Sequence, residues 1–315
     1  MLPALVCCLP QTTLRGDQAV SNIAFDNPFA HIPNAQTRLL GVIGHPVAHS
    51  LSPALHNPAL AWLGLNMRYL AFHVYPERLP EAVRGFVAMG MRGFNATVPH
   101  KEALLPLMDW LDPLAERIGA VNTVAIDPDG LLRGYNTDAQ GFTDALAETE
   151  GWRSSTEWGD RSVLVLGAGG AARGVVVGLL EAGIRTLTVA NRTLARAEQL
   201  LADLAPHYPQ ATLRAVPQEP LPLEGVDLLV NTTLLGLAGE EMQMVEMDRL
   251  PDTALIYDIV YAPRETPLLR AAKRRGLAVQ NGLGMLIHQG RRGFKIWTGE
   301  EMPVERVRAR LLGLL

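Results

Sequence analysis

Small residues at a fixed spacing follow an apolar run in the second half of this sequence. The run Val163-Leu164-Val165-Leu166 is typical of a strand covered on both faces, and the loop Gly167-Ala168-Gly169-Gly170-Ala171-Ala172 comes directly after it. Glycine in this loop lets the backbone turn tightly and approach a pyrophosphate closely. The helix expected after the loop would direct free N–H groups and its positive end toward phosphate. With a further strand over 186–190, this βαβ unit predicts a dinucleotide site.

The end of that further strand indicates which dinucleotide the chain prefers. Enzymes that use NAD place Asp or Glu here to accept a hydrogen bond from the ribose 2′-hydroxyl. This sequence has Asn191-Arg192-Thr193 instead, and Arg196 follows one helical turn later. A guanidinium pairs with a 2′-phosphate, which a carboxylate would repel. The alternative is that both arginines are solvated surface charges, but their position at this strand end favours NADP over NAD.

Polar side chains also stand at predicted strand ends and helix starts in the first half of the sequence. Ser50 and Ser52 follow the first strand, and Asn95-Ala96-Thr97-Val98-Pro99-His100-Lys101 runs from a strand end into a helix start. Asn122 opens another strand, and Asp138 precedes a helical run. Ligands of open α/β sheets bind at the carboxyl ends of strands. Hydroxyls, an amide, a lysine and an aspartate at one edge, beside a cofactor domain, therefore indicate a functional site.

Each of these residues also has a simpler interpretation. Ser52 is expected to be a helix N-cap, whatever else it does, and the alternative for Asp138 is that it is only a cap. Lysines are usually exposed, and threonine and asparagine often only satisfy turn backbone, which would account for Lys101, Thr97 and Asn122. The histidines at positions 45, 49, 56, 100 and 288 show no metal-binding spacing, so we expect loop or surface histidines and no metal site.

The elements that must position these residues alternate between strand and helix. Apolar runs predict strands over 39–44, 69–74, 92–98, 121–126, 163–166, 186–190, 227–231 and 254–259. Ser52 followed by proline marks a helix start, and the last of the expected helices spans 284–297. This alternation predicts an α/β fold with an N-terminal, mainly parallel α/β substrate domain, a Rossmann-type NADP-binding domain and a cleft between them.

A polar stretch over 150–160, with two tryptophans and little periodicity, predicts the linker between the two domains. We therefore divide the chain into an N-terminal extension (1–38), a substrate-binding catalytic domain (39–150) and an NADP-binding domain (151–283). The helices at about 284–315 are expected to pack back on the catalytic domain. The extension mixes Pro, Asn and Gln without periodicity, and a signal peptide is not expected there because a basic start is missing.

The composition of the 315 residues narrows the functional classes further. Hydrophobic residues make up 48% and charged residues 19%, which is ordinary for a globular protein with a sizeable core. A net charge of -4 argues against a nucleic-acid partner, and we expect the basic run Lys273-Arg274-Arg275 to be a solvated helix face or helix end. The two cysteines, Cys7 and Cys8, are neighbours and cannot form a disulfide framework. Since no apolar run is long enough for a membrane span, we expect a cytoplasmic protein without a membrane partner.

Taken together, these motifs resemble those of the NADP-dependent shikimate dehydrogenases over about residues 39–299. The shared motifs are Ser50-Leu-Ser52-Pro, Asn95-x-Thr97-x-Pro99-x-Lys101, Gly119-Ala-Val-Asn122-Thr, Gly134-Tyr-Asn136-Thr-Asp138, the glycine loop, Asn191-Arg-Thr and Asn281-Gly-Leu-Gly-Met-Leu-Ile-His-Gln289-Gly. Several of these motifs are long and specific. The N-terminal extension lies outside the family pattern.

The resemblance implies a role for each site residue. Lys101 and Asp138 would be the catalytic pair. The carboxylate and hydroxyls of the substrate would be held by Ser50, Ser52, Thr97, Asn122, Tyr261 and Gln289. The cofactor would contact Gly167, Ala168, Gly169, Gly170, Ala171, Asn191, Arg192, Thr193, Arg196, Ile259 and Gly282. Because Met285 lies one helical turn from Gln289, both can face the substrate, although core packing explains Met285 equally well.

The implied reaction is the reversible NADP-dependent oxidation of shikimate to 3-dehydroshikimate, a step toward chorismate and the aromatic amino acids. The partners would be this small-molecule substrate and NADP, and the enzyme would be a monomer or homodimer. The alternative is a quinate/shikimate dehydrogenase with relaxed substrate or cofactor choice, but Ser50, Ser52 and Arg192 together favour shikimate. A non-catalytic NADPH-binding regulator is expected to lose Lys101 or Asp138, and this sequence keeps both.

Overall fold

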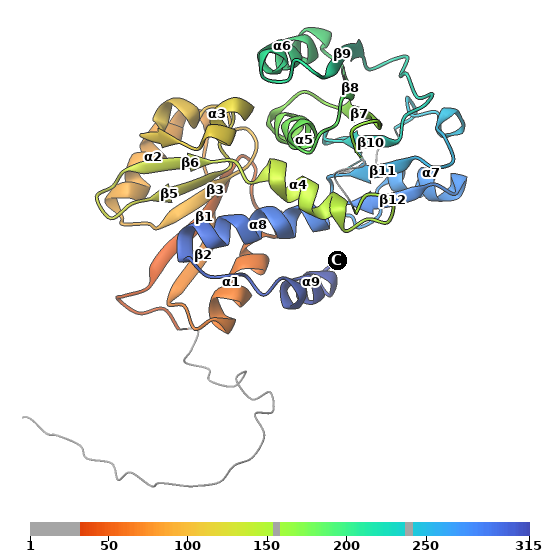
Figure 1. Cartoon of the computed structure of the whole chain (residues 1–315). Helices are drawn as coiled ribbons and strands as arrows, with labels where there is room; N and C mark the ends of the chain where they lie inside the picture. Colours follow the sequence, from red (N-terminus) through yellow and green to blue (C-terminus); the bar gives the residue numbers. More distant parts are fainter. Residues whose placement is uncertain (1–31, 154–157, 237–241) are drawn as a thin grey trace, which may run out of the picture. The chain divides into compact units, whose positions relative to one another are not determined.

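The computed structural model describes residues 32–153, 158–236 and 242–315, and these residues form two six-stranded sheets flanked by helices (Figure 1). In spatial order the strands of the first sheet are β2 (Met67–His73), β1 (Arg38–Gly44), β3 (Gly93–Ala96), β5 (Thr123–Ile126), β6 (Leu132–Tyr135) and β4 (Trp110–Leu111). Strands β2 and β3 pair with β1 in parallel, whereas β5 pairs antiparallel with both β3 and β6.

The second sheet is parallel throughout, as a doubly wound α/β fold requires. In spatial order its strands are β12 (Ala278–Asn281), β11 (Leu255–Asp258), β10 (Leu228–Asn231), β7 (Ser162–Leu166), β8 (Thr186–Asn191) and β9 (Thr212–Pro217). The glycine loop leaves β7 at the centre of this sheet. The order therefore confirms the predicted dinucleotide-binding type of fold.

The helices fall between the strands in sequence, and short 3-10 turns join some of them. The helices are α1 (Ser52–Trp62), α2 (Leu79–Ala88), α3 (Pro113–Ile118), α4 (Asp138–Ala147), α5 (Gly170–Glu181), α6 (Leu194–Leu204), α7 (Pro267–Arg275), α8 (Leu283–Thr298) and α9 (Val304–Leu312). The 3-10 turns are η1 (Pro76–Arg78), η2 (Leu105–Leu107), η4 (Ala205–His207) and η5 (Met247–Arg249). The basic run Lys273-Arg274-Arg275 lies in the last turn of α7, as predicted. Positive charges there interact favourably with the negative end of the helix dipole.

Strand β7 shows how one short apolar run builds two cores. Successive side chains of a strand point to opposite faces, and all four apolar residues of β7 are buried. Val163 and Val165 pack into the core shared with α4, α5 and α6, whereas Leu164 and Leu166 pack into a separate core on the other face, together with side chains of α7. A continuous apolar run is therefore required here, because neither face of the strand meets water.

The first sheet is covered in the same way, and the C-terminal helices supply one of its layers. Leu40 and Val42 of β1 pack with side chains of α1, α8 and α9, whereas Ile43 packs on the opposite face with α2. Helix α8 contacts both α1 and α4, and α9 contacts α1 (Figure 1). The chain thus adds its last two helices to the first sheet after completing the second.

The first sheet is mainly parallel, as predicted, although β5 pairs antiparallel with β3 and β6. Sequence patterns did not anticipate the strands β4, β6, β9 and β12. One expectation needs correction. The predicted linker over 150–160, of which 154–157 lie outside the described residues, is more than a connection. Trp152 and Trp158 are 2% and 1% exposed and pack against each other in the core with α4 and α5. Their burial explains why a segment without periodicity contains two large aromatic residues.

Candidate active site

Lys101 and Asp138, 37 positions apart in sequence, form a buried ion pair. Lys101 Nζ donates to Asp138 Oδ2 at 2.5 Å, and the two side chains are 13% and 7% exposed. Asn122 Nδ2 donates to the other carboxylate oxygen at 2.8 Å. Both oxygens of the carboxylate thus have protein donors, which fixes the carboxylate beside the ammonium group.

The local structure explains why the Asp138 carboxylate is free to face the lysine. Asp138 is the first residue of α4, where the positive end of the helix dipole favours a negative charge. The prediction that it caps this helix is wrong: Thr137 is the N-cap residue, and no side chain makes a capping hydrogen bond. Instead, the Asp138 backbone N–H donates to Asn136 Oδ1 at 3.0 Å. The capping prediction for Ser52 is wrong in the same way, because Leu51 is the N-cap residue of α1.

A buried polar network lies beneath the ion pair. Asn95 Nδ2 donates to Asn122 O and to Thr123 Oγ1, and the Tyr69 hydroxyl donates to Asn95 Oδ1 at 2.6 Å. Asn122 Oδ1 accepts from the backbone N–H of Thr137 at 2.8 Å. Asn122 is therefore held from several sides, and its amide has little freedom to turn.

Sequence reasoning did not assign roles to the members of this network other than Asn122. A signal for Asn95 was present, since it is the single polar residue in the otherwise apolar β3 and is 5% exposed. For Tyr69 there was none, because a tyrosine in a strand usually only packs. Burial raises the pKa of the Tyr69 phenol well above its usual value, and a hydrogen bond with Ser52 opposes this effect. The phenol therefore stays protonated and connects the serine pair to Asn95.

The predicted substrate-binding residues of the first sheet lie close to this network. Ser50 Oγ donates to Ser52 Oγ at 3.2 Å and accepts from the Ser52 backbone N–H at 3.3 Å. Ser52 is 7% exposed, whereas Ser50 and Thr97 are half-buried. Thr97 directly follows β3, and its backbone N–H donates to Ile43 O at the end of β1. These hydroxyls thus stand at the carboxyl ends of neighbouring strands, as the sequence predicted.

Two predicted substrate residues come from later parts of the chain. Tyr261 follows β11 and packs with Leu51, beside the serine pair. Burial raises the pKa of its phenol, and a hydrogen bond with the Leu51 backbone opposes the shift. Gln289 Oε1 of α8 accepts a hydrogen bond from Thr137 Oγ1 at 3.5 Å, and Thr137 is the residue immediately before Asp138. Met285, one turn earlier, is 7% exposed and packs in the core with α4 and α5, so core packing accounts for it.

The glycine loop begins at a position where only glycine fits. Gly167 has a φ of 107°, and a Cβ there would lie 2.6 Å from Thr232 Oγ1. Gly169 is the exposed N-cap residue of α5, and no atom lies within 4 Å of where its Cβ would stand. Ala168, Gly170 and Ala171 are half-buried. Backbone N–H groups at the start of α5 can therefore be approached closely by a phosphate group.

The strand end beside this loop carries the predicted 2′-phosphate residues. Strand β8 pairs with β7, and the Gly167 backbone N–H donates to Ala190 O at 2.8 Å. Asn191 Nδ2 donates to Thr193 O at 2.8 Å, which orders the turn into α6. Arg192 and Arg196 are exposed, and within the described part of the chain neither has an ion-pair partner. Their guanidinium groups are thus available for an anionic ligand.

The last two predicted cofactor residues lie against each other. A Cβ on Gly282 would stand 1.8 Å from Ile259 O, so only glycine fits at this position. The neighbouring Asp258, which sequence reasoning left without a role, is fully buried. Its carboxylate accepts from Asn231 Nδ2, Thr266 Oγ1 and the Val260 N–H, and burial raises its pKa although these bonds lower it. Asp258 therefore fixes the loop that leads to Tyr261.

Helix α5 connects the glycine loop to the Lys101–Asp138 pair. Gly170, Gly174 and Gly178 recur every four residues and therefore share one helix face. A Cβ on Gly170 would lie 3.4 Å from Lys101 Cβ, and one on Gly174 would lie 3.0 Å from Asp138 Cβ. On Gly178 it would lie 2.5 Å from the backbone oxygen of the residue after Asp138. This glycine face lets the start of α4 and Lys101 approach α5 closely.

The histidine prediction holds in part. His49 is exposed, and His100 lies in a loop although it is buried. The expectation of loop or surface positions is wrong for His56 and His288, which are buried in α1 and α8. His56 stacks on Tyr69 with ring centroids 4.3 Å apart, and desolvation lowers its pKa to about 3. Across residues 32–153, 158–236 and 242–315, no group of three or more His, Cys, Asp or Glu side chains could hold a metal ion. Within the same residues, no helix has the length and apolar character that crossing a membrane requires.

Family models match three parts of the chain. The shikimate dehydrogenase substrate binding domain matches residues 42–124, and the shikimate / quinate 5-dehydrogenase model matches residues 150–266. The shikimate 5'-dehydrogenase C-terminal domain matches residues 282–312. These matches cover most strands of both sheets and the C-terminal helices, whereas β6, α4 and β12 lie between the matched ranges.

Individual relatives resemble the chain over most of its length. A shikimate dehydrogenase (NADP(+)) of Magnetococcus marinus is 51% identical over 276 residues, which cover 87% of this chain and 95% of the relative. The crystal structure of shikimate dehydrogenase from Aquifex aeolicus matches with a TM-score of 0.80 and 40% identity, covering 89% of this chain and 99% of that one. Shikimate 5-dehydrogenase from Thermus thermophilus, solved with NADP(H) and shikimate, matches with a TM-score of 0.75 and 40% identity over 88% of this chain and 100% of that one. With this identity over nearly its whole described length, the chain belongs to the shikimate dehydrogenase family.

Proposed function

We propose that this chain catalyses the reversible NADP-dependent oxidation of shikimate to 3-dehydroshikimate, on the route to chorismate and the aromatic amino acids. The observation that carries the proposal is the buried Lys101–Asp138 pair, held by Asn122 and placed beside Gly170 of the glycine loop. A proton-transferring group next to a dinucleotide loop is what oxidation of a secondary alcohol requires. Relatives named for this activity cover nearly the same length of chain.

The residues of the second sheet fit NADP. Gly167 and the open position at Gly169 leave room for a pyrophosphate at the start of α5, and Arg192 and Arg196 offer exposed guanidinium groups for a 2′-phosphate. We assign Ala168, Gly170, Ala171, Asn191 and Thr193 to the same surface, with Ile259 and Gly282 near the nicotinamide. When bound, NADP supplies the nicotinamide ring that exchanges a hydride with the substrate carbon.

The chain's own residues supply the proton transfer and the orientation. Lys101 Nζ takes the proton of the reacting hydroxyl during oxidation, and its ammonium form returns the proton to the carbonyl oxygen during reduction. Asp138 orients Nζ through their hydrogen bond, and Asn122 holds the carboxylate in place. The remaining carboxylate and hydroxyls of shikimate are bound by Ser50, Ser52, Thr97, Asn122, Tyr261 and Gln289. Holding the substrate carbon in one orientation lowers the entropic part of the barrier.

The domain division also belongs to this proposal. We assign residues 39–150 to a substrate domain and 151–283 to a cofactor domain, with the helices after 283 returned to the substrate domain. Packing of α8 and α9 against α1 supports the last assignment. The expected monomer or homodimer and the cytoplasmic location stay predictions.

A spectrophotometric assay of NADPH formation tests the function. The full chain is incubated with shikimate or quinate, each with NADP and with NAD, and kcat/KM is measured for the four pairs. We expect shikimate with NADP to give the highest value, because the serine pair and Arg192 both favour that combination. Comparable values with quinate or NAD would support the relaxed quinate/shikimate dehydrogenase instead. No dehydrogenation of either acid would refute the proposal.

A further inference from the structure

Helices α4 and α8 cross closely at the point where one carries Asp138 and the other carries Gln289. Gly141 of α4 makes the approach possible: a Cβ there would lie 2.6 Å from Gln289 N and 2.7 Å from Gln289 Cβ. Real Cβ atoms do not come this near to backbone, so any side chain at Gly141 must push the two helices apart. One turn further along α4, a Cβ on Gly284 of α8 would lie 3.1 Å from Ala145 Cβ, so the contact continues along the pair.

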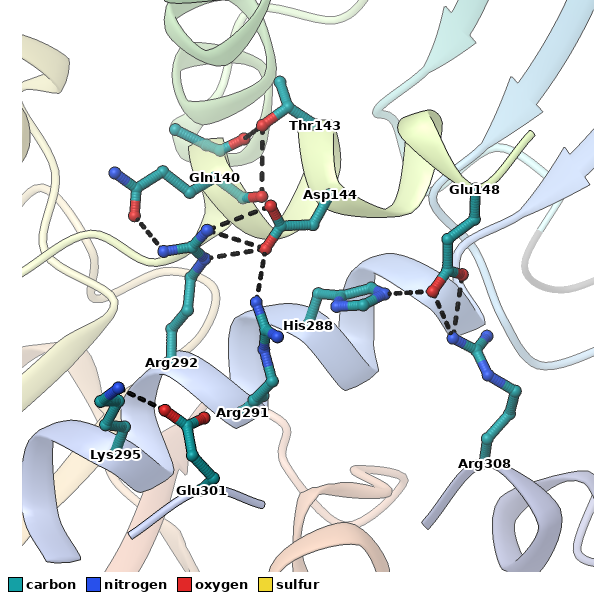
Figure 2. Close-up of polar contacts among 11 residues, drawn as sticks. Gln140, Thr143, Asp144, Glu148, His288, Arg291, Arg292, Lys295, Glu301 and Arg308 are labelled. Carbon is teal, nitrogen blue, oxygen red and sulfur yellow. Dashed lines mark hydrogen bonds and ion pairs between the residues drawn. The ribbon is translucent and has the colours of Figure 1, made fainter. Parts of the chain in front are cut away.

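Ion pairs fix how the two helices are aligned along their axes (Figure 2). Asp144 of α4 accepts from Arg291 at 3.1 Å and from Arg292 at 3.0 Å, and its side chain is 26% exposed. Arg292 Nη1 also donates to Gln140 Oε1 at 2.7 Å. One carboxylate thus binds the two residues of α8 that come two and three positions after Gln289.

A second carboxylate repeats the arrangement at the end of α4. Glu148 accepts from His288 Nε2 at 2.8 Å and from Arg308 Nη2 at 2.8 and 2.9 Å (Figure 2). His288 directly precedes Gln289, and Arg308 comes from α9. Residues on both sides of Gln289 therefore contact α4: His288 binds Glu148, and Arg291 and Arg292 bind Asp144 one turn earlier. A slip of α8 along α4 would break both sets of contacts.

We propose that Gly141 and Asp144 are positioning residues that set Gln289 next to Thr137 and Asp138 for substrate binding. The proposal rests on the proposed function, because Gln289 is assigned there to shikimate. Gln289 Oε1 lies 3.5 Å from Thr137 Oγ1, and its Nε2 donates to Leu286 O at 3.1 Å. Gly141 sets how near the amide comes to the catalytic pair, and Asp144 sets its position along α4. Neither residue is among those assigned to the substrate.

The test measures KM and kcat for shikimate at saturating NADP in Gly141→Ala and Asp144→Asn. We expect Gly141→Ala to raise the KM for shikimate about tenfold or more, because small displacements of a binding group are costly. Asp144→Asn should raise it about threefold, because the charge network is partly exposed. The KM for NADP should not change in either variant. Asp144→Glu, which keeps the charge, should recover part of the loss.

Coupling to Gln289 separates this role from a general structural one. In a Gln289→Ala chain the binding amide is already gone, so adding Asp144→Asn should change the KM for shikimate no further. If the two substitutions instead multiply their effects, or if Asp144→Asn alone has the wild-type KM, the proposal is wrong. Asp144→Asn and its double variant decide the matter if Gly141→Ala does not fold.

Two matched controls are available within the same chain. Glu301→Gln removes an ion pair with Lys295 of α8 that does not reach α4 (Figure 2). Gly85→Ala places a methyl group in α2, where no atom lies within 4 Å of the Cβ. Both should leave the KM for shikimate unchanged. A wild-type chain inactive on shikimate would overturn the proposed function and this inference together, whereas an active wild type with an unaffected Asp144→Asn variant would overturn the inference alone.

Discussion

The functional edges of the two sheets are organised in opposite ways. At the edge of the first sheet, polar groups are bonded to one another: Asp138 accepts from Lys101 and Asn122, and Asn122 is held in turn by Asn95 and Thr137. At the edge of the second sheet, Arg192 and Arg196 are exposed and have no ion-pair partner among the described residues. The polar groups of the first sheet are thus already fixed by bonds within the protein, whereas the guanidinium groups of the second sheet are open to an anion. In the proposed function, the first set would hold the reacting geometry and the second would bind the cofactor.

Removing the amine of Lys101, at the edge of the first sheet, should have the largest effect on turnover. Lys101→Ala is expected to lower kcat by about 10²–10⁴-fold, the usual contribution of a general acid–base group, with little change in the KM for shikimate. Steady-state kinetics with shikimate and NADP measure both quantities. A raised KM with a normal kcat would make Lys101 a binding residue only. NADPH binding, followed by fluorescence, should match that of the wild type and serves as the control for folding.

Removing a positive charge at the edge of the second sheet should alter the preference between NADP and NAD and leave the Lys101–Asp138 pair intact. Arg192→Ala removes charge-assisted hydrogen bonds worth about 1.5–3 kcal/mol each, so the KM for NADP should rise about 10- to 100-fold. The KM for NAD, which lacks the 2′-phosphate, should stay nearly the same. Parallel titrations with the two cofactors check this. An equal loss with both cofactors would contradict the assignment of Arg192 to the 2′-phosphate.

The bonds beneath the first edge can be tested with a smaller change. Tyr69→Phe removes one hydroxyl and leaves Asn95 Oδ1 without its 2.6 Å donor, at a cost of about 1–3 kcal/mol in the free energy of unfolding. Because the same hydroxyl contacts Ser52, the KM for shikimate should rise a few-fold. Urea unfolding and kinetics measure the two effects. Tyr257→Phe, in the equally buried β11, is the matched control and should leave the KM unchanged. If both variants behave alike, the network has no special role.

The last prediction concerns stability alone, through a group of the first region that makes no hydrogen bond. Both ring nitrogens of His56 are buried without a hydrogen-bond partner in the described structure, and burial lowers its pKa to about 3. In the unfolded chain the His56 ring becomes protonated below about pH 6.5, whereas in the folded chain it stays neutral down to about pH 3. The free energy of unfolding therefore has its full value above pH 6.5 and falls as the pH falls toward 3. The loss is about 1.4 kcal/mol per pH unit in that window.

Replacing this ring should therefore flatten the acid side of the stability profile. Between pH 7 and pH 5 the wild type should lose about 2 kcal/mol more than His56→Phe, since only the part below about pH 6.5 counts. Phenylalanine keeps the stacking on Tyr69 and Phe294. Denaturant unfolding at the two pH values measures the difference. Identical losses in the two proteins would show that His56 is not the source.

Sequence reasoning located most of the strands, because buried parallel strands are continuous apolar runs that stand out from their surroundings. Strand β7 and the glycine loop after it were placed in this way, and the parallel second sheet followed from strand–helix alternation. The two-residue strand β4 is too short to show a pattern. Strand β6, Leu132–Tyr135, contains arginine and glycine, and its pairing with β5 depends on tertiary contacts.

The candidate site divides in a similar way. Lys101, Asp138 and Asn122 could be selected because their residue types suit chemistry and they stand next to strand ends. The capping predictions for Ser52 and Asp138 were wrong, because residue preference alone does not say whether a residue is the last before a helix or the first within it. Tyr69 and Asp258 could not be found from sequence, since their importance lies in what surrounds them after folding. The burial of His56 could not be predicted for the same reason, because a histidine in a sequence does not by itself indicate a buried position.

The glycine face of α5 has a practical consequence for anyone who redesigns this enzyme. The helix whose first turn would meet the phosphates is approached closely, at Gly170 and Gly174, by the side chains of Lys101 and Asp138. Remodelling that helix to accommodate another nucleotide would therefore disturb turnover as well, because the two tasks share one rigid body. The turn after β8, where Arg192 is exposed, is the place where we expect nucleotide preference to be changed at little cost to catalysis.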